Sequence, residues 1–97
     1  MTRQVLFRPE ADAEVAEASQ WYEQRRSGLG GEFAAAAAEV VSRIVENPLV
    51  FPRVHGQTRR AILRRFPYAL YFRTLGDDIV VLAVQGRQHP RRWQSRI

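Results

Sequence analysis

The stretch Ile79-Val80-Val81-Leu82-Ala83-Val84 decides the fold of this chain, because every residue in it is apolar. A strand with one face in water alternates apolar and polar residues, whereas a strand covered on both faces is apolar throughout. We therefore expect residues 79–84 to form a central strand of a sheet. The segment Leu75-Gly76-Asp77-Asp78, directly before it, is rich in turn-forming residues and predicts a hairpin to the preceding strand.

Two further strands are predicted on the N-terminal side of that turn. Residues 69–74 alternate between two faces, as a half-buried strand does. Residues 59–65 place the apolar run Ala61-Ile62-Leu63 between two pairs of arginines, and Pro67 separates this segment from the next one. The second half of the chain is therefore predicted to be a run of three strands joined by turns.

The first half predicts one short strand and two helices. Residues 5–7 are apolar and suit a strand. Apolar side chains then recur at helical spacing from about residue 10 to 26, and again from about residue 31 to 46. The glycine-rich segment 27–31 must break the first helix, and Asn47-Pro48 ends the second. Helices joined by so short a connection fold back on each other as an antiparallel hairpin.

The predicted order of elements is β-α-α-β-β-β, which defines an α+β fold. An N-terminal strand and a helical hairpin pack on one face of a mainly antiparallel sheet. The chain has 97 residues, which leaves room for a single domain over residues 1–97.

The composition excludes several classes of protein and site. The chain has no cysteine, which excludes disulfides and thiol chemistry, and its two histidines lie far apart in the sequence. We therefore expect no metal site and no cofactor. No apolar run approaches the ~18 residues that span a membrane. The first residues do not form the apolar core of a signal peptide, so we expect a cytoplasmic protein.

Charge is divided unevenly between the two halves. Residues 1–50 carry five arginines and eight carboxylates, a net charge of −3, whereas residues 51–97 carry ten arginines and two carboxylates, a net charge of +8. Every cationic side chain is arginine, and the chain has no lysine. The second half is therefore expected to meet an acidic partner, either a nucleic acid or an acidic protein.

Short landmarks with a characteristic order and spacing run through nearly the whole chain. They are Trp21-Tyr22, Gly28-Leu29-Gly30, Phe33, Asn47-Pro48, Phe51-Pro52, Arg60, Phe66-Pro67-Tyr68, Val81-Leu82-Ala83-Val84 and Pro90-Arg91-Arg92-Trp93. Together with the predicted order of elements, they resemble the ParE/RelE toxin superfamily, and within it the ParE-like branch. The resemblance implies a toxin of a type II toxin–antitoxin system, of the kind linked to plasmid stabilization. Its partner would be a cognate antitoxin protein, bound in a hetero-oligomer.

The superfamily contains two chemistries. The ParE-like branch implies a protein that binds and inhibits DNA gyrase, and the RelE-like branch implies a ribosome-dependent mRNA endoribonuclease. Members of the superfamily often carry a histidine just after the last strand. Here the segment from Gln85 to His89 is one residue short, and its only histidine is His89, next to Pro90. This departure leaves a third reading open, a non-toxic member that only binds.

Metal-independent RNA cleavage needs a base, an acid and cations near the phosphate. Arg60, Arg64 and Arg87 could supply the cations, and His89 is the best candidate for proton transfer. Arginine keeps its proton and is a poor base, and no lysine is present to replace it. The sequence therefore favours a binding inhibitor over an enzyme, with gyrase as the target and the ribosome with its mRNA as the alternative.

Two sets of residues are predicted to bind proteins. The basic segment after the last strand is expected to contact the target, through arginine and tryptophan side chains of the kind enriched at interface hot spots. Its residues are Arg87, His89, Arg91, Arg92, Trp93 and Arg96. Apolar residues that a small core leaves uncovered are expected to anchor the antitoxin. They are Trp21, Leu29, Val50 and Phe51, for which burial in the core is the alternative.

Overall fold

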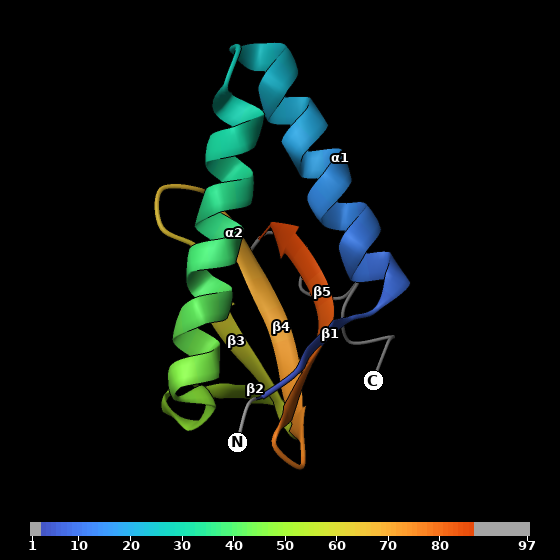
Figure 1. Cartoon of the computed structure of the whole chain (residues 1–97), viewed down its shortest axis with the longest axis vertical. Coiled ribbons are helices and arrows are strands. Elements are labelled where there is room, and N and C mark those ends of the chain that lie inside the picture. The colour runs from blue at the N-terminus through green and yellow to red at the C-terminus, as the bar shows by residue number, and fades with distance from the viewer. Residues whose placement is uncertain (1–2, 87–97) are drawn as a thin grey trace.

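The computed structural model describes residues 3–86 of the chain, in which two helices lie against a five-stranded sheet (Figure 1). The elements are, in order, β1 (Val5–Phe7), α1 (Pro9–Arg25), α2 (Leu29–Glu46), the 3-10 turn η1 (Pro48–Val50), β2 (Arg53–His55), β3 (Thr58–Ile62), β4 (Tyr68–Leu75) and β5 (Asp78–Gly86). No helix within residues 3–86 is long and apolar enough to cross a membrane.

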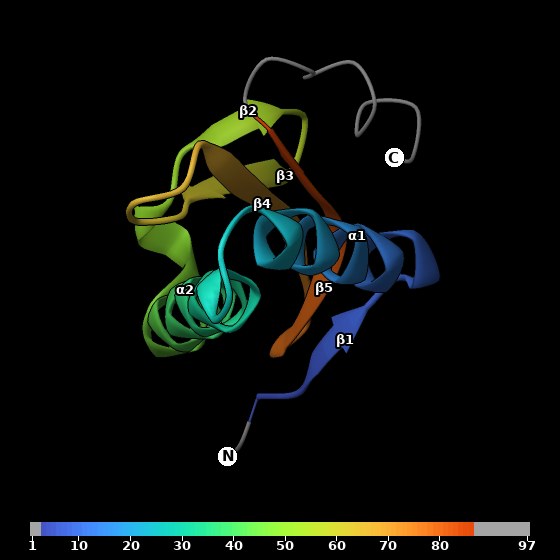
Figure 2. The ribbon, with the colours of Figure 1, turned by 90° about the horizontal axis from the view of Figure 1, so that it is seen from above.

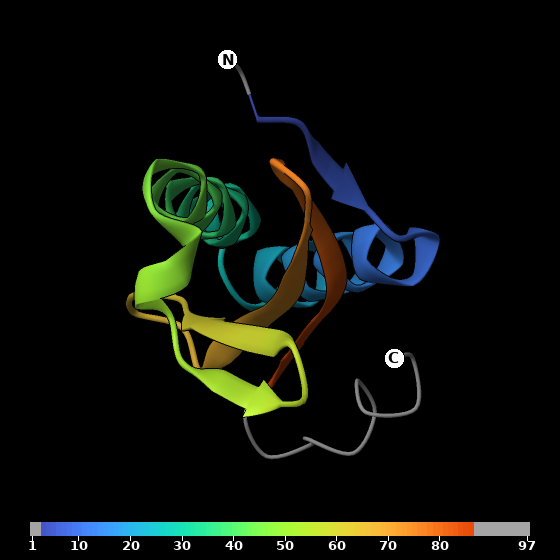
Figure 3. The same ribbon diagram turned by 90° about the horizontal axis from the view of Figure 1, so that it is seen from below.

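The sheet has the strand order β1-β5-β4-β3-β2. β1 runs parallel to β5, and the other three neighbouring pairs are antiparallel. β5 lies between β1 and β4, so the prediction of an internal strand at residues 79–84 is confirmed. Figure 3 shows β2 and β3 running across the direction of β5, so the sheet is strongly twisted.

A β-bulge lies in the β4–β5 ladder. Tyr71 pairs with Ala83 and Phe72 pairs with Val81, so Leu82 is one residue extra on β5. The extra residue changes the alternation of β5. As a result, Val81 and Val84 both reach the main core, on the same face of the sheet as the helices.

The core lies between the helical hairpin and one face of the sheet, as the sequence predicted. Seen from above, α1 crosses β5, and α2 lies beside α1 (Figure 2). α1 faces the core with alanines, whose small side chains let the helix approach the sheet closely, while α2 contributes larger side chains. The buried helix residues of this core are Ala11, Ala18, Phe33, Ala37, Val40 and Ile44.

Three of the differences from the sequence prediction change a turn or a strand of the sheet. α2 begins at Leu29, two residues earlier than expected, because Gly28 alone makes the turn with a φ of 89°. β3 ends at Ile62, because Arg65 turns the chain with a φ of 72°. The third difference is β2, which was not predicted, since three residues are too few to show a period. His55 lies on this edge strand.

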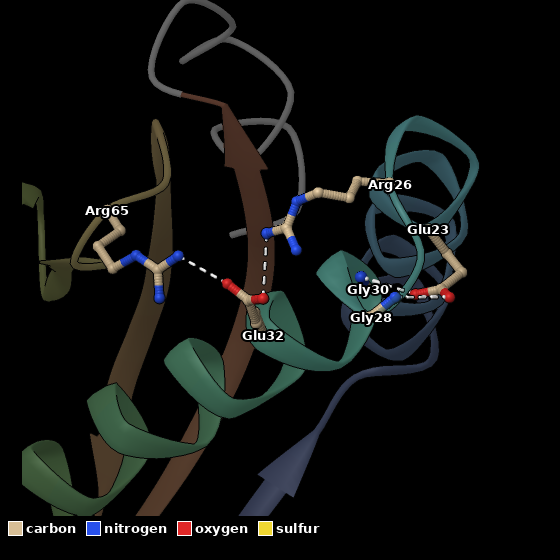
Figure 4. Close-up of polar contacts among 6 residues, drawn as sticks. All are labelled: Glu23, Arg26, Gly28, Gly30, Glu32 and Arg65. Carbon is tan, nitrogen blue, oxygen red and sulfur yellow. Dashed lines mark hydrogen bonds and ion pairs between the residues drawn. The ribbon is translucent and has the colours of Figure 1, made fainter.

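The two helices come closest at Gly30. A Cβ atom built on Gly30 would collide with the backbone oxygen of Ser19 in α1. The carboxylate of Glu23, also in α1, accepts hydrogen bonds from the Gly28 N–H (2.9 Å) and the Gly30 N–H (3.0 Å), as Figure 4 shows. Glu23 therefore satisfies two N–H groups at the N-terminus of α2, where a negative charge is favourable.

This contact predicts opposite effects for two neighbouring glycines. Gly30→Ala should lower the free energy of unfolding by about 1–3 kcal/mol, because the added methyl group forces the helices apart. Gly31→Ala is the matched control, because a Cβ at Gly31 meets nothing within 4 Å. It should raise the free energy of unfolding by roughly 0.5–1 kcal/mol through its helix propensity. Chemical denaturation measures both, and equal changes in the two variants would contradict the assignment.

Candidate functional site

The residues predicted to bind the target lie outside the described part of the chain. They are Arg87, His89, Arg91, Arg92, Trp93 and Arg96, and two of them, Arg87 and His89, were also candidates for RNA cleavage. β5 ends at Gly86, so this segment continues directly from the internal strand of the sheet. Its role in binding therefore stays a prediction.

The structure separates the other two cleavage candidates. Arg60 precedes Ala61, whose side chain lies in the main core, so Arg60 lies on the face of the sheet away from the helices. Arg64 lies in the loop after β3 and forms an ion pair with Glu39 of α2, with a distance of 3.8 Å. The two guanidinium groups therefore do not share one site.

The face of the sheet away from the helices combines cations with a buried ring. Arg60 pairs across the strands with Tyr71, which is only 1% exposed and packs with Ala69 and Ala83 in a second small cluster. Arg73 lies two residues beyond Tyr71, on the same face and exposed to solvent. The Nε of Arg60 is buried and has no hydrogen-bond acceptor within residues 3–86. This face of the sheet therefore carries the arginines Arg60 and Arg73, while the ring of Tyr71 is covered.

The four residues predicted to anchor an antitoxin lie at opposite ends of the helical hairpin. Trp21 and Leu29 lie near its tip, whereas Val50 and Phe51 follow the far end of α2 (Figure 1). Trp21 and Val50 are exposed, by 49% and 66%. Leu29 and Phe51 pack against the core, and Phe51 contacts the Phe72 ring with centroids 5.9 Å apart. Two of the four residues are thus available on the surface, and they do not form one patch.

A cleft of about 390 Å³ lies between α1 and the adjoining ends of β4 and β5. One wall carries the α1 residues Glu14, Glu17 and Trp21, and the opposite wall includes Tyr68 and Gln85. This cleft was not predicted from the sequence. Glu14, Glu17 and Trp21 are spaced so that they share one face of a helix, and this spacing is the sequence pattern that indicates the α1 wall. The strand wall has no such signal, because only folding brings it opposite α1.

Glu14 connects α1 to β5 beyond the point where β1, within residues 3–86, ends its pairing with β5. β1 stops at Phe7, and the last backbone bond on this side runs from the Arg8 N–H to the Val81 oxygen (2.9 Å). Further along β5, the Glu14 carboxylate accepts bonds from the Val84 N–H (2.9 Å) and the Gln85 side-chain amide (2.6 Å). A side chain thereby takes over from β1 as the hydrogen-bonding partner of the edge.

Aromatic rings form the floor of the cleft and join it to the core. Tyr22 stacks on Phe33 (centroids 5.4 Å apart) and meets the Tyr68 ring edge to face (6.1 Å). Burial, and the neighbouring Tyr68, raise the pKa of the Tyr22 phenol. Trp21 lies at the rim, and the guanidinium of Arg25 is 4.1 Å from the centre of its ring. The cleft is therefore aromatic at its base and acidic on its helix wall.

The loop that contributes Pro67 to the cleft is held to α2 by ion pairs. Glu32 accepts a hydrogen bond from Arg65 (2.7 Å) on one carboxylate oxygen and from Arg26 (3.0 Å) on the other, as Figure 4 shows. The hydrogen bond from Arg65, and after it the one from Arg26, lowers the pKa of the Glu32 carboxyl below its ordinary value of 4.5. Both arginines are more than half exposed, so salt should weaken the pairs.

This shift predicts a pH dependence of stability. Because the pKa of Glu32 is lower in the folded chain, its stabilising effect is complete above pH 4.5 and is lost as the pH falls through the folded-state pKa. Glu32→Gln should therefore remove part of the acid-induced loss of stability. Urea denaturation at pH 7 and at steps below pH 4.5, in low and high salt, measures the difference. If the free energy of unfolding falls with pH equally in the unchanged chain and in Glu32→Gln at low salt, the lowered pKa of Glu32 is contradicted.

The contact between Glu14 and β5 makes a second prediction. Glu14→Ala leaves the Val84 N–H and the Gln85 amide without their acceptor, which should lower the free energy of unfolding by about 2–3 kcal/mol. Glu17→Ala, one turn further along α1 and exposed, is the control and should change it by no more than about 0.5 kcal/mol. Thermal and chemical denaturation measure both. If Glu14→Ala is as stable as Glu17→Ala, the carboxylate does not hold the edge.

Comparison with solved structures places this architecture among known folds. A chain of the chromosomal ParDE toxin–antitoxin system of P. aeruginosa matches with a TM-score of 0.66 and 16% sequence identity, over 88% of this chain and 96% of that one. A chain of the RelBE2 toxin–antitoxin complex of Mycobacterium tuberculosis matches with a TM-score of 0.62 and 19% identity, over 90% of this chain and 100% of that one. No protein-family model and no curated protein matches the sequence. The chain therefore shares its fold with these chains of ParDE and RelBE2 toxin–antitoxin systems.

Proposed function

We propose that this chain is the toxin of a type II toxin–antitoxin pair, that it binds and inhibits DNA gyrase as the ParE-like branch does, and that a cognate antitoxin neutralises it. The observation that carries the proposal is the shared fold. It extends over nearly the full length of a chain from a ParDE system and of one from a RelBE2 complex. The landmarks quoted from the sequence add to it, because they are spread over the same elements.

The distribution of chemistry supports inhibition by binding rather than cleavage. The basic side chains of the described residues are arginines with no lysine among them, and arginine does not transfer protons near neutral pH. A cleavage site would have to bring Arg60 and Arg64 together. Arg60 lies on the face of the sheet away from the helices, whereas Arg64 lies in the loop after β3 and pairs with Glu39 of α2. A binding surface needs charge and shape but no proton transfer, and the basic second half of the chain provides that charge.

A neutralising partner fits the exposed apolar side chains of the helical layer. Trp21 and Val50 are both exposed although they are large and apolar, and they lie near opposite ends of the hairpin. An extended antitoxin arm that follows the hairpin could contact both of them, whereas a compact partner could reach only one. Such an arm would also stabilise the folded chain by mass action.

One observation favours cleavage as the second candidate function. The buried Nε of Arg60 has no acceptor within residues 3–86, and Arg73 projects from the same face of the sheet. A phosphate oxygen would satisfy that donor, as it would in a RelE-like endoribonuclease.

A non-toxic protein that only binds is the third candidate function, and the shortened segment from Gln85 to His89 is the feature that favours it.

Induced expression of the chain alone in bacteria separates the three functions. Gyrase inhibition predicts filamentous cells, induction of the SOS response and loss of supercoiling activity of purified gyrase. Cleavage predicts arrest of translation with cut transcripts, and the binding-only reading predicts normal growth. Normal growth, at a level of soluble protein confirmed by immunoblot, would exclude a toxin.

Three variants test which surface acts. Arg91→Glu with Arg92→Glu should raise the concentration that half-inhibits gyrase by about tenfold or more, because charge reversal at a hot spot costs at least that much affinity. Arg8→Glu with Arg53→Glu makes the same charge change at exposed positions of the described chain and should leave inhibition unchanged. Arg60→Gln should also leave it unchanged. If Arg60→Gln abolishes arrest while the double reversal at 91 and 92 does not, the toxin acts through the sheet face and gyrase binding by the basic segment is wrong.

A further inference from the structure

The cleft between α1 and the ends of β4 and β5 has a charge opposite to that of the whole protein. The chain carries a net charge of +5, yet among residues 3–86 the charged residues that line the cleft are Glu14 and Glu17. Glu14 is engaged with β5, whereas Glu17 is exposed on the next turn of the helix. The cleft volume of about 390 Å³ falls in the range of about 300–1,000 Å³ that is typical of ligand sites.

The strand wall of the cleft contains a buried hydrogen-bond acceptor without a donor. Gln85 lines the cleft and is only 4% exposed. Its Nε2 donates to the Glu14 carboxylate (2.6 Å), which sets the orientation of the amide. The Oε1 is therefore turned away from Glu14, and it has no donor within residues 3–86. A buried acceptor left without a donor is costly, so this oxygen points to a ligand that donates hydrogen bonds.

The aromatic rings of the cleft suit a flat cation. Trp21 is 49% exposed at the rim, and its ring already carries the guanidinium of Arg25 at 4.1 Å. Tyr22 and Tyr68 continue the aromatic surface inward. Rings of this kind attract a guanidinium through cation–π contact, and more strongly where water is excluded.

We propose that this cleft binds the arginine side chain of a partner polypeptide. Glu17 provides a negative charge at the rim in addition to that of Glu14, which is bonded to β5, and Trp21 and the tyrosines provide ring faces. Gln85 also lines the cleft, and its buried Oε1 has no donor within residues 3–86. The guanidinium presents five N–H donors in one plane, so it can donate to both walls while its faces contact the rings. Glu17 and Trp21 at the open rim leave space for the backbone that carries the arginine.

Two other occupants fit the cleft less well. The ammonium of lysine is compact and strongly hydrated, and it has no flat face to stack on a ring. A metal ion would need a group of three or more side-chain ligands, and residues 3–86 contain no such group of His, Asp and Glu. The cleft lies on the α1 side of the sheet, and arginine binding there does not depend on whether the chain inhibits gyrase.

Titration of the full chain with short peptides tests the proposal, with the Trp21 indole N–H resonance in nitrogen-15 NMR spectra as the readout. Trp21→Phe assigns the resonance, because the chain has two tryptophans. Acetyl-Gly-Arg-Gly-amide should shift this resonance saturably, whereas the peptide with citrulline in place of arginine, which lacks the charge, should not. The lysine peptide should bind at least about fivefold more weakly. No saturable shift, or an equal response to citrulline, would overturn the proposal.

Charge-neutral variants locate the site. Glu17→Gln should weaken the arginine peptide about two- to fivefold, as expected for one solvent-exposed ion pair. Glu46→Gln makes the same change at an exposed position that does not line the cleft and should leave affinity unchanged. Equal affinities of wild type and Glu17→Gln would overturn the assignment. Gln85→Leu, checked for folding by circular dichroism, should weaken the peptide as well, and full affinity in that variant would remove Gln85 from the site.

Two further binding experiments identify the molecule that supplies the arginine. The tripeptide should bind severalfold more tightly than free arginine amide, and equal affinities would rule out recognition of a polypeptide. The chain also has arginines of its own beyond β5, at positions 87, 91, 92 and 96. Changing these four to glutamine should leave peptide affinity unchanged. Binding that appears only in that variant would make the chain's own segment the occupant and would overturn the proposal of a partner.

Discussion

The hydrogen-bonded ladder between β4 and β5 is the interaction on which the rest of this structure depends. β5 pairs with β4 along its length and with β1 over three residues, and α1 packs across it. Its side chains are buried on both faces of the sheet, in the main core on the helix side and in the small cluster around Tyr71 on the other. Both candidate surfaces begin from this strand, because the cleft lies at its C-terminal end and the basic segment continues from it.

The short length of β1 has consequences for the whole α1 side. Because β1 covers only the first part of β5, the backbone of β5 beyond Val81 would face α1 without a partner. Glu14 accepts the Val84 N–H and so allows an incomplete sheet edge to be buried beneath a helix. The same carboxylate orients the Gln85 amide and leaves its oxygen without a donor. The part of β5 that β1 does not pair with thus forms one wall of the cleft.

The uneven charge of the sequence is only partly balanced by ion pairs within residues 3–86. Carboxylates of the first half lie on the helices, where some pair with arginines of the second half, as Glu32 does with Arg65. Arg59 donates to the backbone oxygens of Leu49 and Phe51, whereas Arg60 and Arg73 lie on the face of the sheet away from the helices. The fold therefore does not cancel the charge asymmetry. It keeps acidic side chains in a cleft of a protein whose net charge is +5.

The sequence by itself determined the elements whose signal is long and periodic. The apolar run 79–84 predicted an internal strand, the helical spacing of α1 and α2 predicted the hairpin, and the order of landmarks predicted the fold that the structural comparisons show. Only the tertiary structure decided the rest. β2 is too short to show a period, and the parallel pairing of β1 with β5 joins residues more than seventy positions apart. The separation of Arg60 from Arg64, and the meeting of Glu17 with Gln85 across a cleft, likewise depend on which strands face which helix. Those arrangements arise from burial and hydrogen bonding across the whole chain, and no local pattern of residues encodes them.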